Sequence, residues 1–227
     1  MSKKHVLSIG GSLIVPNGGI DWKYLKRLRA FVLNEVAIGR KLYLVIGGGA
    51  TARHYIDAAA QTIAVTDSDK DWLGIHSSRL NAHLVRTVLF DVAHPEIITH
   101  PDVPMKTKEP AVVAAGWKPG WSTDYVAVTV AKTYGVKSVI NLSNIAYAYN
   151  KDPNKFSDAK KLKKVSWEDF RNIVGYRLQP GLSGPFDPIA SGLAAELKLT
   201  VYIADGKKLR NVEKILAGET FSGTIVG

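Results

Sequence analysis

The residues of this chain best suited to chemistry are three consecutive glycines, Gly47-Gly48-Gly49, followed one helical turn later by Arg53. They come directly after the apolar stretch 42–46 and open a helical pattern. Glycines let backbone amides approach a ligand closely, and the positive end of the helix points the same way. A guanidinium one turn further on reaches back with paired donors for phosphate oxygens. The pattern predicts an anion-binding turn; a tight turn with a surface arginine is the alternative.

Two more glycine-rich segments follow expected strands. One is Gly10-Gly11-Ser12 after 5–9, and the other is the segment 116–123, Gly-Trp-Lys-Pro-Gly-Trp-Ser-Thr, after 111–115. Open α/β sheets bind ligands at the carboxyl ends of their strands. Two anion-binding turns facing each other suit two phosphorylated ligands and in-line phosphoryl transfer, which predicts a kinase. The chain has no P-loop and lacks the protein-kinase motifs.

The elements that position these turns alternate between β-branched runs and helical patterns, which predicts an α/β fold of parallel strands joined by crossover helices. The segment 147–164 is polar and is expected to form a hairpin or excursion before a helix capped by Ser166 and Asp169. A composition shift near residue 143 suggests two lobes of a single domain, 1–142 and 143–227. The expected strands are 5–9, 42–46, 111–115, 138–142, 200–204 and 224–226, and the expected helices are 22–36, 50–62, 71–89, 123–134, 187–197 and 209–217.

Composition narrows the class of protein. The 227 residues are 46% hydrophobic, enough for a sizeable core, and include no cysteine, so disulfides and thiolate metal sites are excluded. Neither a membrane-spanning run nor a signal peptide is evident, which suggests a cytoplasmic chain. The net charge of +10 suits an anionic partner. No nucleic-acid-binding motif occurs, and we expect the lysine cluster 160–164 to be a solvated face rather than a nucleic-acid site.

Taken together, the motifs resemble the UMP (uridylate) kinases of the amino acid kinase superfamily, most closely the archaeal type, over essentially the whole chain. The matching residues are, in order, Gly47-Gly48-Gly49 with Arg53; Asp71, Gly74, Ile75, Ser78, Arg79, Asn81 and Ala82; Gly116, Pro119, Gly120, Ser122 and Thr123; Ser143-Asn144 with Tyr149 and Asp152-Pro153; and Asp187-Pro188.

The resemblance implies a three-layer α/β/α sandwich with a mainly parallel central sheet. It also implies a cytoplasmic homohexamer built from dimers that uses ATP and Mg²⁺ to convert UMP to UDP. It assigns catalysis to Arg53 and Asp187 and assigns no side chain as a metal ligand. The implied ATP-binding residues are Gly11, Ser12, Gly49, Arg53, Ser143, Asn144, Tyr149 and Asp152, and the implied UMP-binding residues are Gly48, Asp71, Trp117, Lys118, Pro119, Gly120, Trp121, Ser122 and Thr123.

Two positions depart from the family pattern. Ser8 stands where many members carry a lysine, and Ala146-Tyr147 replaces a usual Asp-Gly pair. Losing a preorganised cation costs about 2.7 to 4 kcal/mol of transition-state stabilisation unless another cation substitutes. A nucleotide-binding regulatory or storage protein therefore stays open as an alternative, as does a kinase for another acceptor such as isopentenyl phosphate or carbamate.

Several of the assigned residues have a plainer interpretation. Asp71 could cap a helix. Tyr149 could be a packed aromatic. Trp117 and Trp121 could stack on a base or pack against a neighbouring subunit.

Overall fold

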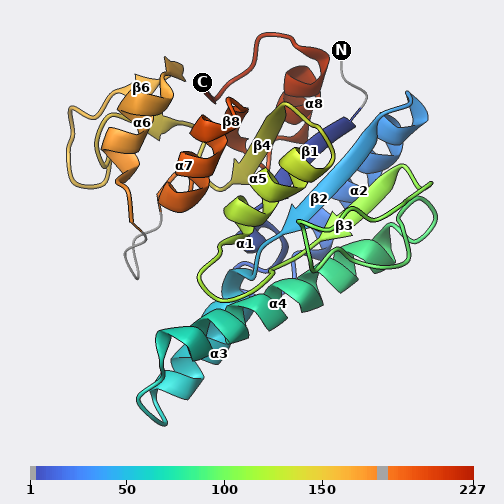
Figure 1. Ribbon diagram of the computed structural model, residues 1–227, viewed down its shortest axis with the longest axis horizontal. Helices are drawn as coiled ribbons and strands as arrows, with labels where there is room; N and C mark the ends of the chain where they lie inside the picture. Colours follow the sequence, from blue (N-terminus) through green and yellow to red (C-terminus); the bar gives the residue numbers. More distant parts are fainter. Residues whose placement is uncertain (1–3, 178–183) are drawn as a thin grey trace.

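The computed structural model describes residues 4–177 and 184–227 and has a seven-stranded sheet at its centre (Figure 1). The strand order is β3-β2-β1-β4-β8-β9-β7, and every pair is parallel except β8 with β9. A separate antiparallel hairpin joins β5 to β6. The strands are β1 (Lys4–Ile9), β2 (Lys41–Ile46), β3 (Ala111–Ala114), β4 (Ser138–Ser143), β5 (Ala148–Tyr149), β6 (Lys161–Leu162), β7 (Lys164–Val165), β8 (Thr200–Asp205) and β9 (Thr224–Val226).

Helices cover both faces of the sheet. One apolar cluster joins β1 and β2 to α2, α4 and α8, and a second joins the opposite face to α5, α6 and α7. The α3–α4 pair extends away from the sheet in Figure 1. The helices are α1 (Gly11–Ile14), α2 (Trp22–Ala37), α3 (Gly49–Ala60), α4 (Asp67–Val88), α5 (Thr123–Thr133), α6 (Trp167–Val174), α7 (Pro188–Glu196) and α8 (Leu209–Ala217). This arrangement confirms the predicted three-layer α/β/α sandwich.

The central strands are covered on both sides, as their sequences require. Five of the six residues of both β1 and β2 are buried, which matches the continuous apolar runs typical of parallel strands between two helical layers. Because β1 and β2 pair in register from Lys4↔Lys41 to Ile9↔Ile46, their carboxyl ends finish side by side. The first two glycine turns therefore leave the sheet as neighbours.

The predicted boundaries differ from the structure in a few places. Helix α4 begins at Asp67, a turn earlier than expected, because Thr66 accepts a hydrogen bond from the Asp69 amide at 3.1 Å and caps it. Asp71 lies inside the helix, so the prediction of a cap at Asp71 is wrong. The short α1 and the edge strand β7 were not predicted. The hairpin in 147–164 is confirmed, and the lysines at 160, 161, 163 and 164 are exposed, as expected for a solvated face.

Candidate active site

The first two glycine turns touch backbone to backbone. A Cβ on Gly47 would lie 2.7 Å from the Gly11 nitrogen, and a Cβ on Gly49 would lie 2.5 Å from the Gly11 oxygen. Gly49 also has a φ of +61°, a conformation that side chains disfavour. Any side chain here would separate the turns, so glycine is required for them to form one continuous surface of main-chain groups.

Arg53 links α3, the helix that begins at Gly49, to the first turn. Its exposed guanidinium donates from Nη1 to Ser12 Oγ at 3.4 Å and from Nη2 to Asn17 Oδ1 at 2.9 Å. The structure thus brings Gly11, Ser12, Gly49 and Arg53 together at the carboxyl edge of the sheet. Two of the five N–H donors of the guanidinium are used in these bonds, and the others can bind an anion.

The third glycine-rich segment, 116–123, is held in place by α4. Asp71 Oδ2 accepts a hydrogen bond from the Gly120 amide at 2.7 Å. Ser78 Oγ accepts one from the Gly116 amide at 2.9 Å, and Arg79 donates to the carbonyl oxygens of Gly116 and Trp117 at 3.1 and 2.9 Å. The loop is therefore anchored at its start and in its middle by one helix.

Aromatic rings fill the middle of this loop. Trp117 and Trp121 stack with centroids 6.3 Å apart, and Trp121 lies 3.9 Å from the Tyr125 ring. The Lys118 ammonium is 4.1 Å from the centroid of Trp117. Both indoles are half-buried. The rings pack on one another, and this arrangement leaves both predicted uses, base stacking and subunit contact, untested.

A pair of aspartates lies between α5 and α7. Asp187 is buried at 8% exposure and caps α7, its Oδ1 accepting from the Ala190 amide at 2.6 Å. Asp124 Oδ1 accepts from the Ser8 hydroxyl at 2.9 Å, and its Oδ2 accepts from the Asp187 amide at 3.2 Å. The hydroxyl of Ser8 thus supports a carboxylate instead of supplying a charge.

Desolvation raises the pKa of both carboxyls. The pKa of Asp124 rises to about 6, with the nearby charge of Asp187 adding to the effect and the Ser8 hydroxyl opposing it. The pKa of Asp187 is raised for the same reason, and its amide partners and the Ser122 hydroxyl oppose the shift. Asp187 Oδ2 is buried and makes no hydrogen bond of normal geometry within the described residues.

The predicted ATP-binding residues fall into two groups. Ser143 ends β4 beside the first turn, where the Gly10 amide donates to the Leu142 carbonyl at 2.8 Å, and Asn144 is the exposed residue that follows. Tyr149 lies in the β5–β6 hairpin and Asp152 in its loop, and no hydrogen bond among the described residues links either one to the glycine turns. The structure therefore gathers the first group at the turns and leaves the second apart.

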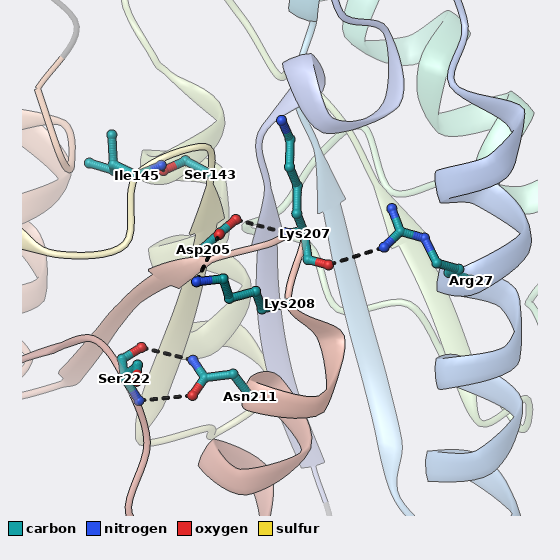
Figure 2. Close-up of polar contacts among 8 residues, drawn as sticks. All are labelled: Arg27, Ser143, Ile145, Asp205, Lys207, Lys208, Asn211 and Ser222. Carbon is teal, nitrogen blue, oxygen red and sulfur yellow. Dashed lines mark hydrogen bonds and ion pairs between the residues drawn. The ribbon is translucent and has the colours of Figure 1, made fainter.

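A fourth strand-end turn, overlooked in the sequence, lies beside Ser143 (Figure 2). The Gly206 amide donates to the Ser143 carbonyl at 2.8 Å, and Asp205 Oδ1 accepts from the Lys207 amide at 3.0 Å. The Lys207 carbonyl accepts from Arg27 at 3.3 Å. The sequence could have indicated this turn, since Gly206 directly follows a strand, as Gly10 and Gly47 do. Asp124 was not singled out from the sequence, and Asn81 was named only as part of the family motif without a role, because a polar residue in a helical pattern is ordinarily exposed.

Comparison with known proteins agrees with this geometry. A sequence profile described as the amino acid kinase family matches residues 3–205. The chain belongs to the amino acid kinase family. Its similarity to uridylate kinases spans the whole chain. It is 33% identical to the enzyme of Staphylothermus marinus over 100% of this chain and 99% of that protein, and 35% identical to that of Methanosarcina barkeri over 94% and 91%.

Solved structures of the amino acid kinase fold are similar as well. The uridylate kinase of Archaeoglobus fulgidus has a TM-score of 0.84 at 26% identity and covers 99% of this chain and 100% of its own. The UMP kinase of Bacillus anthracis has a TM-score of 0.79 at 19% identity over 99% and 96%, which shows the shared fold. The predicted family resemblance is confirmed.

The departures from the family pattern have visible structural consequences. Among the described residues only Lys198 combines a side chain with positive φ, so Ala146-Tyr147 forms its turn without the left-handed conformation that glycine favours.

No group of three or more His, Cys, Asp or Glu suited to a metal occurs in residues 4–177 and 184–227. No helix in the same residues is long and apolar enough to span a membrane.

Proposed function

We propose that this chain catalyses the ATP-dependent phosphorylation of UMP to UDP. The observation that carries the proposal is the backbone contact between the Gly10–Ser12 and Gly47–Gly49 turns, with Arg53 donating to Ser12 of the first turn. This surface lies between the end of β4 and the 116–123 loop, so it offers one side to a donor and the other to an acceptor. The uridylate kinase relatives that match over the whole chain support UMP as the acceptor.

Positioning and charge neutralisation carry the reaction. A phosphate acceptor is already ionised at neutral pH, so no strong base is required, and the attacking and leaving oxygens need only be held in line. The amides of the two turns and the Arg53 guanidinium orient the transferring phosphoryl group and neutralise its charge. Asp187, buried and fixed by its own helix, organises the groups around the phosphates.

Mg²⁺ fits this site as an ion that arrives with ATP. It is typically held by one or two carboxylates together with substrate phosphates, not by an all-protein cage. Asp187 Oδ2, buried without a normal hydrogen bond, is the oxygen that would hold it. Asp124, whose carboxylate accepts from the Asp187 amide, lies next to it. When bound, the ion offsets phosphate charge.

The remaining residues divide between a donor (ATP) side and an acceptor (UMP) side of the two turns. We assign ATP to Gly11, Ser12, Gly49, Arg53, Ser143, Asn144, Tyr149 and Asp152, and UMP to Gly48, Asp71 and the loop from Trp117 through Lys118, Pro119, Gly120, Trp121 and Ser122 to Thr123. For Asp71 to accept from the ribose hydroxyls, its carboxylate must share or give up the Gly120 amide. Tyr149 and Asp152 must reach ATP from the hairpin.

The proposed setting is the cytoplasm, in pyrimidine nucleotide synthesis, with the chain assembled as a homohexamer, a trimer of dimers. Trp22 is 64% exposed and Trp72 is 40% exposed, and burying such rings in a subunit interface removes apolar surface from water. Sedimentation of the purified chain tests this assembly: a hexamer is expected, and a monomer at micromolar concentration contradicts it.

The experiment that tests the function is a coupled ADP-release assay with UMP, CMP and isopentenyl phosphate in parallel. UMP should give the highest kcat/KM. Turnover with isopentenyl phosphate alone would reassign the acceptor. ATP-dependent thermal stabilisation without ADP release from any acceptor would point to a nucleotide-binding regulatory or storage protein.

A further inference from the structure

Asn81 is a buried amide in the middle of α4, 3% exposed, with its Nδ2 directed at the central glycine turn. Its Nδ2 donates to the carbonyl oxygens of Gly47 at 3.0 Å and Gly48 at 2.9 Å, and its Oδ1 accepts from the Thr51 hydroxyl at 3.4 Å. A buried carboxamide is costly unless it is satisfied, and here both donor hydrogens are used on adjacent peptide groups.

Those two hydrogen bonds fix the direction of two amides. In a trans peptide the C=O and N–H point to opposite sides, so holding the Gly47 and Gly48 carbonyls turns the N–H groups of Gly48 and Gly49 away from α4. Gly11 packs against the Gly49 nitrogen, which places the first glycine turn on that same side. Neither amide donates to any group in the described part of the chain.

We propose that Asn81 is a positioning residue for phosphoryl transfer: it aims the Gly48 and Gly49 amides at the phosphates. The inference rests on the proposed function for its kinetic consequences. Three glycines in a row have many accessible conformations, so an external clamp is needed to preorganise them. Asn81 supplies that clamp without touching the substrate.

Two neighbours of Asn81 on α4 position the acceptor loop as Asn81 positions the glycine turn. Ser78 and Arg79, within one turn of Asn81, hold the Gly116 and Trp117 backbone at the start of the acceptor loop. One helix thus sets the distance between the phosphate-binding amides and the acceptor loop. A shift of about 1 Å between reacting groups costs on the order of a hundredfold in rate.

Asn81→Asp tests the proposal, because it keeps the shape of the side chain but turns an oxygen toward two carbonyl oxygens. We expect kcat to fall about a hundredfold, with a smaller rise in the KM for UMP because the Gly48 amide is assigned to that ligand. Asn81→Ala, which removes the clamp without repulsion, should lose less turnover in the same direction. Val85→Ala, a core change one turn further along α4, is the matched control and should keep the wild-type kcat after correction for its folded fraction.

Binding measurements keep the two proposals separable. Titration calorimetry with ATP should show weaker binding by about tenfold in Asn81→Asp and unchanged binding in Val85→Ala, whether or not the wild type phosphorylates UMP. Wild-type kcat and ATP affinity in both Asn81 variants, corrected for folded fraction by urea unfolding, would overturn the positioning role. Failure of the wild type to turn over UMP would overturn the proposed function alone.

Discussion

Replacing Asp187 by asparagine separates the catalytic role of this residue from its structural one. Oδ1 caps α7 through the Ala190 amide at 2.6 Å, and asparagine caps helices as well as aspartate does, so the fold is retained. The substitution removes a negative charge from a side chain only 8% exposed. Losing one preorganised electrostatic group at a reacting centre costs about 2.7 to 4 kcal/mol, so kcat should fall about a hundred- to a thousandfold.

The assay combines kinetics, binding and stability on the same protein. Coupled ADP release gives kcat, calorimetry gives the UMP dissociation constant, and urea unfolding gives the free energy of unfolding. Asp21→Asn is the matched control, since Asp21 caps α2 through the Tyr24 amide at 2.8 Å and lies outside the site. Equal losses of kcat and UMP affinity in Asp187→Asn, or wild-type turnover, would refute the assigned role.

Other perturbations follow from the same geometry. Arg53→Ala should lower kcat and raise the KM for ATP without changing stability, because the side chain is exposed; wild-type turnover in the ADP-release assay would contradict the role of Arg53 in catalysis. Desolvation holds the pKa of Asp124 at about 6, above that of an unfolded carboxyl, so this group binds more proton in the folded chain and its contribution to the free energy of unfolding decreases from about pH 4 to about pH 6. Urea titrations should show a shallower decrease in Asp124→Asn, and an unchanged slope would exclude Asp124 as its source. Gly47→Ala should destabilise by about 1 to 3 kcal/mol in urea, since its Cβ meets the first turn, whereas Gly74→Ala, helical with open space, should stabilise by about 0.5 to 1 kcal/mol; the reverse order would contradict the packing of the turns.

The fold was largely predictable because its strands are short, apolar and separated by helical periods. Runs such as 42–46 and 111–115 carry the signature of strands covered on both faces. The boundary of α4 was predicted a turn late because the apolar pattern begins after its polar first turn, which Thr66 caps. The edge strand β7, only two residues long, has no period that a sequence can display.

The site was predictable where function requires a local pattern and not where it requires a distant contact. Glycines at strand ends identify the turns, because backbone groups cannot approach one another past a Cβ. The pairing of Ser8 with Asp124 joins residues 116 positions apart, and the clamp from Asn81 joins residues more than 30 apart. Such partners follow only from the packing of helices on the sheet.

The most direct test of the central claim follows the γ-phosphate of ATP. ATP labelled at the γ-phosphate and UMP should yield UDP labelled at its β-phosphate, with intersecting initial-velocity lines and no transfer of label to the protein when UMP is absent. Those results are expected if the two glycine turns hold both nucleotides at once for direct transfer. No label in UDP, or parallel velocity lines with labelled protein in the absence of UMP, would contradict direct transfer.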